Sequence, residues 1–475
     1  GHGPDEQALR FMLGLAPARL QLSYLADDTR VDFNARKGPS TPMACELCAG
    51  FAGTYALKIL LERGPVPVAP RGIHFDAYRN KLSTTWRPGG NNHPVQRLGL
   101  MVARKMVLGK SADVPPSQET FETPMERVLD LARWAPSGDN EQPWQFELVD
   151  AHRARIYTHD TRDWCVYDLD GSSSQIAVGA LMETLEIAAS GEGMTVWWQS
   201  VDDRPEHEPA FDVELVADPG VQPSRLLPFV RSRTTQRKPF STRSLTPAQK
   251  TALEESVGDG YRVIWLEGAV RRRVAKLLFH NAHIRLTTPE AYEVHRQNIE
   301  WGVRFSEERL PEHALGADFF TRRIMRWALG SWSRVQFLNR FFAGTWLPRL
   351  QMDLLTGLRC AAHFVIVADT PARSAQDYMA GGRAMQRFWL ESTRQNLQFQ
   401  PEMTPVIFSR YVADGVSFTA IDSEARLAAQ LARELDDILG PEQDAARRVF
   451  MGRVGTGQAP ASRSLRKSLA RLGLQ

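Results

Sequence analysis

One short run of the sequence concentrates residue types that could hold a planar, electron-rich ligand by its polar edge. It reads Ala-Pro-Ser-Gly-Asp-Asn-Glu-Gln-Pro-Trp over 135–144, between a predicted helix and a strand predicted over 145–148. Because turn formers leave several backbone N–H groups here without partners, those groups can donate to a ligand. Ser137 adds a hydroxyl, and Asn140 carries both a donor and an acceptor. The alternative is a helix-to-strand turn that binds nothing.

A second run, over 231–240, alternates arginine with hydroxyl residues and reads Arg-Ser-Arg-Thr-Thr-Gln-Arg-Lys-Pro-Phe. Guanidinium groups bind phosphate in a bidentate manner, and hydroxyl groups beside them suit a polyol chain. The pattern therefore predicts a clamp for phosphate and ribityl groups that uses Arg233, Thr235 and Arg237. A solvated basic turn is the alternative.

Basic residues near the end of the sequence are a third candidate. Arg453 lies in Met-Gly-Arg-Val-Gly-Thr-Gly over 451–457, and Arg463 and Arg466 follow. Each of the three could reach a phosphate, and the sequence does not choose among them. The glycines do not form a Walker or Rossmann loop, because neither a following helix nor a Lys-Ser/Thr pair is present.

These segments resemble the nitroreductase family over roughly residues 123–470. The first is similar to its Pro-Ser-x-x-Asn-x-Gln-Pro-Trp loop, and the second to its Arg-x-Ser/Thr-x-Arg/Lys-x-Phe segment, although Phe240 comes one position late. The resemblance implies bound flavin mononucleotide (FMN), with the loop at the flavin and the basic residues at the FMN tail. The implied binding residues are Pro136, Ser137, Gly138, Asn140, Arg233, Thr235, Arg237, Arg453, Arg463 and Arg466.

The same resemblance implies a class of reaction. In such proteins FMN carries a hydride at its N5 atom, and the protein supplies position and electrostatics. An FMN-dependent oxidoreductase would transfer hydride between NAD(P)H or an organic donor and a small-molecule or peptide acceptor. The sequence singles out no catalytic side chain and predicts no metal site. The alternatives are a flavin-holding or regulatory protein with a covered FMN and little turnover, or a non-catalytic module that docks a carrier protein.

The chain after residue 122 contains two similar halves. Capping boxes with proline at the first helical position begin at Thr123 and at Thr246. Two long helices, predicted over 175–190 and 382–396, align so that Gly179 matches Gly382 and Gly193 matches Asn396. The early glycines permit close helix approach, and Gly and Asn suit a left-handed helix end. Two unrelated amphipathic helices are the alternative to duplication.

We therefore predict an α+β, nitroreductase-like fold, an antiparallel sheet flanked by helices, duplicated within the chain as a pseudo-dimer. The halves are 123–230 and 231–475, and the second carries a helical insertion at about 268–350 that is rich in arginine and aromatic residues. The insertion is expected to be a lid or an inter-domain arm, with a membrane-surface helix as the alternative. Because the loop belongs to the first half and the Arg segment to the second, the halves would complete one site, with one FMN per chain.

Residues 1–95 carry a different pattern. An apolar helix predicted over 44–62 ends at Arg63-Gly-Pro, and extended segments lead to His74-Phe-Asp-Ala-Tyr. This order resembles the C-terminal fragment of an E1-like (ThiF-type) domain, so the chain resembles ThiF/nitroreductase fusion proteins, with 96–122 as a connector. The resemblance implies a carrier or ubiquitin-like partner. Since the chain has no Gly-x-Gly-x-x-Gly, we do not expect it to adenylate a substrate.

Composition bounds the remaining possibilities. The 475 residues suffice for two or three domains, and a net charge of +3 is too small to predict nucleic-acid binding. The four cysteines do not make a disulfide framework, and Cys45-Glu-Leu-Cys48 lacks a second pair for zinc, so a buried helix start is expected there. With no visible signal peptide and no uncharged apolar run of about 18 residues, we expect a cytoplasmic protein without membrane contact. The sequence does not decide whether the chain forms a homodimer.

Overall fold

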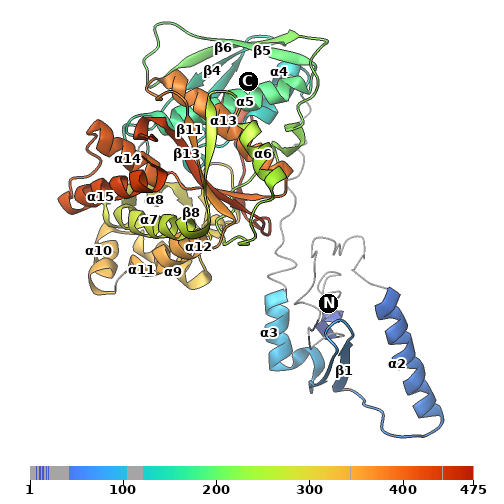
Figure 1. Cartoon of the computed structure of the whole chain (residues 1–475). Helices are drawn as coiled ribbons and strands as arrows, with labels where there is room; N and C mark the ends of the chain where they lie inside the picture. The colour runs from blue at the N-terminus through green and yellow to red at the C-terminus, as the bar shows by residue number, and fades with distance from the viewer. Residues whose placement is uncertain are drawn as a thin grey trace. The chain divides into compact units, whose positions relative to one another are not determined.

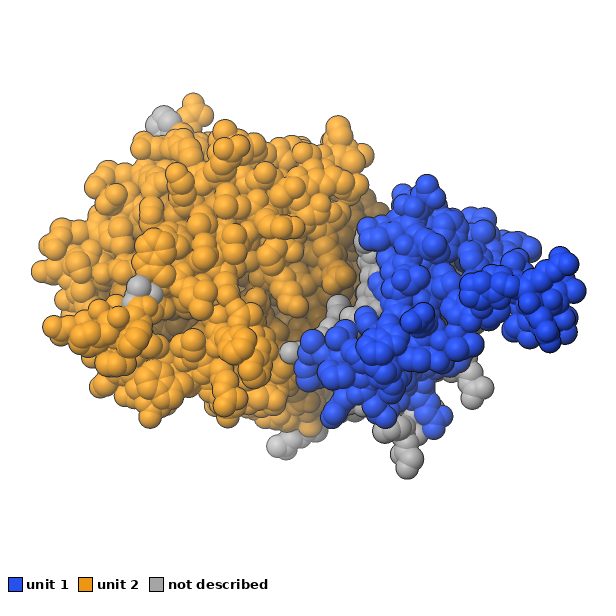
Figure 2. All heavy atoms as spheres, turned by 90° about the horizontal axis from the view of Figure 1, so that it is seen from below, with its two compact units in different colours: residues 1–115 blue, residues 116–475 orange. Residues whose placement is uncertain are grey.

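The computed structural model describes residues 42–103, 121–342, 344–440 and 442–473, together with single positions between 7 and 20. The chain divides into two compact units, residues 1–115 and residues 116–475, which Figure 2 shows in different colours. Of the predicted connector over 96–122, residues 104–120 lie outside the described residues.

The first unit contains a long helix, a small hairpin and a shorter helix. Helix α2 spans Pro42–Leu60, strands β1 (Arg71–Asp76) and β2 (Lys81–Trp86) pair antiparallel, and α3 spans Pro94–Ala103. The helix predicted over 44–62 is confirmed, two residues earlier at each end. The buried helix start expected at the two cysteines is wrong, because both thiols are exposed and no residue of α2 is buried.

Helix α2 is also long and apolar enough to cross a membrane, by length and composition alone. Among the residues that the structure describes, it is the one helix that meets this test. One such helix is weak support for a membrane span, since core helices and signal sequences meet the same criterion.

The second unit begins with a four-stranded sheet and its helices. Neighbouring strands are antiparallel, in the order β3-β4-β6-β5. Trp144 and Phe146 are buried in the core while Gln145 and Glu147 are more exposed, so one face of this sheet packs against helices. The elements are α4 (Pro124–Ala132), β3 (Trp144–Leu148), β4 (Arg153–Thr158), α5 (Ser172–Ser190), β5 (Met194–Ser200) and β6 (Ala210–Ala217).

A second four-stranded sheet repeats the succession of helix, two strands, helix and two strands. Its order, β7-β11-β13-β12, matches that of the first sheet, and its pairs are again antiparallel. The predicted mixture of helices and antiparallel strands is confirmed, as two sheets rather than one. The elements are α6 (Pro247–Ser256), β7 (Tyr261–Leu266), β11 (Ala362–Ala368), α13 (Ala375–Arg394), β12 (Gln398–Pro401) and β13 (Arg448–Gly455).

The second sheet differs from the first because both of its faces are covered. Every residue of β11 and β13 is buried. Phe364 and Ile366 pack with residues of α13, whereas Val365 and Val367 pack with residues of α7. Helix α7 (Gly268–Thr287) opens the long insertion between β7 and β11, so the insertion supplies an additional layer of the core.

The chain between α7 and β11 is mainly helical, and Figure 1 shows α9, α10 and α11 together at the end of the unit remote from β4 and β6. Two further helices, α14 (Thr404–Asp414) and α15 (Asp422–Leu439), separate β12 from β13 and were not predicted. The remaining elements are α8 (Pro289–Asn298), β8 (Ile299–Glu300), β9 (Phe305–Ser306), β10 (Leu310–Pro311), α9 (Phe319–Ala328), α10 (Trp332–Phe341), α11 (Trp346–Pro348), a π-helical turn (Arg349–Leu354), α12 (Leu355–Leu358) and β14 (Arg463–Ser464).

Helices α5 and α13 pack together at the centre of the unit (Figure 1). A Cβ atom at Gly179 would lie 1.9 Å from the carbonyl oxygen of Met379, and one at Gly382 would lie 2.1 Å from that of Ile176. Each glycine therefore contacts the residue three positions before the other glycine, which is a reciprocal contact of the kind a two-fold axis produces. The residues after the helices, Gly193 and Asn396, both have the predicted left-handed conformation, with φ of 68° and 57°.

Candidate functional site

A cavity of about 480 Å³ lies in the second unit, where the loop after α4, the Arg segment before α6, the C-terminal tail and the insertion meet. Nine of the ten residues predicted from the sequence line this cavity, which brings together positions up to 330 residues apart. They are Pro136, Ser137, Gly138, Asn140, Arg233, Thr235, Arg237, Arg463 and Arg466. Arg453 lies elsewhere.

The loop after α4 has a strained backbone. Asp139, Asn140 and Gln142 have positive φ angles of 45°, 69° and 54°, a conformation that costs a non-glycine residue about 1–3 kcal/mol. Gln142 fixes the loop, since its Nε2 donates to the carbonyl of Glu307 at 2.7 Å and its Oε1 accepts from the N–H of Lys467 at 2.9 Å. The insertion and the C-terminal tail therefore hold the loop in this form.

Asn140 connects the same three parts of the chain. Its Nδ2 donates to the carbonyl of Glu307 at 3.1 Å, and its Oδ1 accepts from Nη1 of Arg466 at 2.8 Å. The amide therefore has two protein partners and orients a guanidinium that lines the cavity. Ser137 Oγ likewise accepts from the N–H of Gln142, at 2.9 Å.

Three arginines, Arg233, Arg463 and Arg466, line the cavity. Arg233 and Arg466 are buried, and Arg463 is partly buried. Arg233 donates to the carbonyl of Trp134 at 3.1 Å, and its guanidinium lies 4.4 Å from the ring centroid of Trp389. Arg463 donates to the carbonyls of residues 231 and 233, at 2.9 and 3.0 Å. Arg466 donates to the carbonyl of residue 135 at 2.9 and 3.0 Å, in addition to Asn140.

The positive charge of this arginine cluster is not compensated by any carboxylate among the described residues. Burial, followed by the charges of Arg463 and Arg133, lowers the pKa of Arg466 to about 9, and burial lowers the pKa of Arg463 to about 10. Burial also lowers the pKa of Arg233, and the other two arginines of the cluster add to that shift. Two buried guanidinium atoms, Nε of Arg233 and Nε of Arg463, have no hydrogen-bond partner within the described part of the chain. Positive charge and free N–H donors of this kind can bind an anion.

The Arg segment before α6 reaches the cavity with two more predicted residues. Thr235 forms a parallel bridge with Phe399 at the edge of the second sheet, which fixes the direction of the segment. Arg237 donates to the carbonyl of Ala314 in the insertion at 3.3 Å, and burial lowers its pKa, opposed by the nearby charge of Asp139. The segment is therefore held between the sheet and the insertion.

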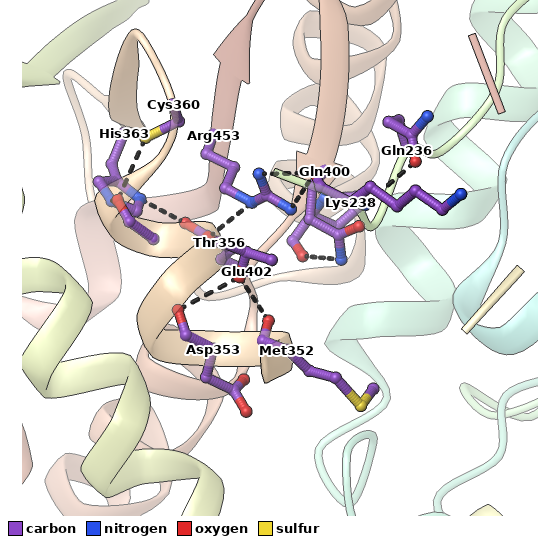
Figure 3. Close-up of polar contacts among 12 residues, drawn as sticks. Gln236, Lys238, Met352, Asp353, Thr356, Cys360, His363, Gln400, Glu402 and Arg453 are labelled. Atoms are coloured by element: carbon purple, nitrogen blue, oxygen red, sulfur yellow. Dashed lines mark hydrogen bonds and ion pairs between the residues drawn. The ribbon is translucent and has the colours of Figure 1, made fainter. Parts of the chain in front are cut away.

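Arg453 has a different environment, in the middle of β13. Its Nε lies 3.3 Å from Oε1 of Glu402, its Nη atoms donate to the carbonyl of Lys238, and its guanidinium lies 4.1 Å from the ring centroid of Phe240. Glu402 also accepts from Nδ1 of His363 at 2.6 Å, as Figure 3 shows. Arg453 is thus paired within the core, and the geometry does not bring it to the cavity.

Sequence reasoning missed several residues that line the cavity. Glu141 lies in the loop itself, and burial, followed by the charge of Asp139, raises its pKa to about 7, against the opposing charges of Lys467 and Arg309. Its position between the two amides of the predicted motif was the signal that could have found it. The insertion contributes an apolar end whose residues no local motif marks, among them Leu310, Leu315, Met325, Leu329 and Leu338.

No protein-family model matches this chain, and no curated protein sequence matches it. Two solved structures are similar to about half of it. One is a nitroreductase-like family protein from Bacillus cereus, 10% identical, with a TM-score of 0.26, covering 52% of this chain and 94% of that chain. The other is the FMN-dependent nitroreductase NfnB from Mycobacterium smegmatis in complex with NADPH, 17% identical, with a TM-score of 0.27, covering 51% and 94%. Because these scores are low, the function has to be argued from the residues of this chain.

Proposed function

We propose that this chain is an FMN-dependent oxidoreductase of the nitroreductase type. The observation that carries the proposal is the cluster of three arginines, two buried and one partly buried, that has no paired carboxylate among the described residues and lines the same cavity as the Pro-Ser-x-x-Asn loop. A dianionic phosphate would accept hydrogen bonds from the Nε atoms of Arg233 and Arg463, which have no partner among the described residues. Buried cations without a partner are costly, and a bound anion removes that cost.

The residues present fit FMN. Arg233, Arg463 and Arg466 would hold the phosphate, and Thr235 and Arg237 the ribityl chain. Pro136, Ser137 and Gly138 would face the ring system, and Asn140 would orient Arg466 for the phosphate. When bound, FMN supplies hydride transfer. NAD(P)H is the proposed electron donor.

The protein contributes a proton-holding group and an apolar chamber to this chemistry. Glu141 retains its proton up to about pH 7 and lines the cavity, so its carboxyl group can supply a proton to an acceptor. Leu315, Met325 and Leu329 line the opposite end, exclude water and favour an apolar small-molecule acceptor over a charged one.

We further propose that the unit is an internally duplicated pseudo-dimer. The shared strand order of the two sheets and the reciprocal glycine contacts of α5 and α13 support this proposal. In a pseudo-dimer, each half supplies what the other lacks at the single site, namely the loop from the first and the Arg segment from the second. The E1-like origin of the first unit, and the carrier or ubiquitin-like partner that it implies, stay predictions.

One observation favours the alternative of a flavin-holding protein with little turnover. The insertion lines the cavity and bonds to Asn140 and Gln142 through the carbonyl of Glu307, so it could cover a bound flavin permanently. Steady-state oxidation of NAD(P)H with quinone and nitroaromatic acceptors separates the two functions. Bound FMN without turnover would favour the alternative.

The direct test of cofactor binding is FMN titration followed by flavin fluorescence. We expect Arg233→Gln to lower FMN affinity about ten- to hundredfold, because a charge-assisted phosphate contact contributes about 1.5–3 kcal/mol. Arg231→Gln is the matched control, since Arg231 pairs with Asp130 and does not line the cavity. A protein that stays colourless after the excess of free FMN has been removed would exclude the proposal.

A further inference from the structure

The outer surface of the insertion has an unusual composition. Residues 319–352 include eight aromatic residues and six arginines, without one Asp or Glu. Several of the large apolar side chains are exposed, including Phe320 at 74%, Phe341 at 64% and Trp346 at 59%. We select six of these exposed side chains and call them the aromatic face: Phe320, Ile324, Trp327, Phe337, Phe341 and Trp346. Soluble monomers rarely expose apolar side chains in such density.

The helices of this region are apolar on two sides, and the cavity accounts for only one. On α9, Met325 and Leu329 line the cavity. On the exposed side of the same helix, Phe320, Ile324 and Trp327 follow one another at spacings of four and three residues, which places them in one stripe. Packing of the insertion on the rest of the unit therefore does not explain the aromatic face.

Arginines lie among these aromatic side chains. Arg323 and Arg326 are exposed on α9. The guanidinium of Arg334 lies 5.2 Å from the ring centroid of Trp327, and that of Arg340 lies 5.6 Å from that of Phe341. Apolar rings beside basic groups suit a surface that is apolar below and anionic above, because rings enter the acyl boundary while guanidinium groups remain among phosphates.

We propose that the aromatic face docks onto an anionic lipid surface. Helices α9 and α10 have ten residues each, half of the roughly 20 that a spanning helix needs, so they would lie in the interface. Figure 1 shows α9–α11 at one end of the unit, so the face can meet a surface without obstruction from the sheets. Ile324 belongs to the face and also lines the cavity, so docking places the rim of the cavity against lipid. This proposal does not depend on FMN binding.

The test is flotation of the full chain with vesicles of phosphatidylglycerol and, separately, of phosphatidylcholine. We expect binding to phosphatidylglycerol that weakens in high salt, because arginine contacts with lipid phosphates are screened. Phe341→Ser combined with Trp346→Ser should reduce binding about tenfold or more, and Arg323→Gln about fivefold. Trp197→Ser is the matched control, since Trp197 is 51% exposed on β5 of the other sheet, and it should leave binding unchanged.

Three outcomes would overturn the proposal. The first is failure to float with phosphatidylglycerol vesicles, or equal binding to both lipids. The second is binding that Ile59→Ser in α2 abolishes while the Phe341 and Trp346 variants retain it, because the exposed helix α2 would then be the contact. The third is self-association in analytical ultracentrifugation that the double variant removes while vesicle binding is absent, which would make a second copy the occupant. Circular dichroism of each variant verifies that it is folded.

Discussion

Two arginines with different partners, Arg453 and Arg463, show how charge compensation in the core differs from that at the cavity. Arg453 has the carboxylate of Glu402 at 3.3 Å, so its charge is compensated inside the protein. Arg463 donates to two backbone carbonyls, and its Nε has no partner among the described residues. Since an uncompensated buried charge is much more costly than a paired one, an anion bound in the cavity would stabilise Arg463.

Glu141 gives the proposed reaction a specific pH dependence. Burial and Asp139 raise its pKa to about 7, so its carboxyl group carries a proton below that pH and loses it above. If this proton reaches the acceptor, turnover with NAD(P)H and a quinone should fall as the pH rises through 7. Glu141→Gln should lower kcat and remove this limb of the profile, whereas Glu147→Gln, exposed on β3, should retain it. If turnover of the Glu141→Gln variant still fell as the pH rose through 7, another group would be responsible for the fall.

The imidazole of His363 links stability to pH in the alkaline range. Its Nδ1 contacts Glu402 and its Nε2 contacts the carbonyl of Gly357 at 2.9 Å, so both neighbours are acceptors and favour the doubly protonated ring. Burial is the largest single influence and lowers the pKa of His363, but the charge of Glu402, the contact with Cys360 and the hydrogen bond to Glu402 together outweigh it, and the pKa rises to about 10. The raised pKa means that the folded state keeps a proton between pH 6.5 and about 10 that the unfolded state releases.

The contribution of His363 is therefore fully present below about pH 6.5 and is lost as the pH rises through 10. We expect the free energy of unfolding to fall in this window by at most about 1.4 kcal/mol per pH unit. Urea unfolding at several pH values should show a shallower decline for His363→Gln than for the parent. His152→Gln, at an exposed position, serves as the control. Equal slopes for all three proteins would contradict the role of His363.

Among the elements, the contact of α5 with α13 is the tightest that a single substitution can probe. Gly179→Ala would place a Cβ atom 1.9 Å from a backbone carbonyl oxygen of α13, so the two helices must separate. Overpacking of this kind costs about 1–3 kcal/mol or more, and we expect a value at the upper end from denaturant unfolding. Gly381→Ala is the neighbouring control, because its Cβ would meet only the side chain of Val449, at 3.0 Å. Similar losses in both variants would show that the approach of the backbones is not special.

The sequence predicted those elements whose signals are local. The capping boxes at Thr123 and Thr246 form with both reciprocal hydrogen bonds, since all of their atoms lie within four residues. The strand predicted over 145–148 is β3, one residue longer. Helices α14 and α15 have no comparable start signal, because neither has an N-cap residue whose side chain accepts a hydrogen bond.

The composition of the cavity could be predicted only in part, because it depends on contacts over long sequence distances. The sequence could not show which of Arg453, Arg463 and Arg466 line the cavity. The pairing of β13 with β11 and β12 places Arg453 in the core instead. Nor did any pattern indicate that the carbonyl of Glu307 would bond to Asn140, 167 residues earlier.

For the whole molecule, the two helix-to-strand connections of the proposed pseudo-dimer differ in a way that bears on stoichiometry. Eleven residues separate α4 from β3 (133–143), whereas four separate α6 from β7 (257–260). At this shorter turn Arg387 donates to the carbonyls of Ser256 and Val257, at 3.0 and 2.6 Å, and pairs with Glu183 at 2.7 Å. The second connection therefore has no counterpart of the longer loop, and the arginine beside it is paired with a carboxylate.

This asymmetry predicts one FMN per chain, at a site that one chain completes by itself. The ratio should be measured from flavin absorbance after denaturation and from protein concentration by amino-acid analysis. FMN occupancy should also stay constant when the protein is diluted, even if light scattering shows that a dimer dissociates, because the loop and the arginines belong to the same chain. Arg233→Gln should reduce the ratio toward zero, and Arg231→Gln should leave it at one. A ratio of two, or FMN release that follows dissociation of chains, would show that a second copy or the second connection contributes a site.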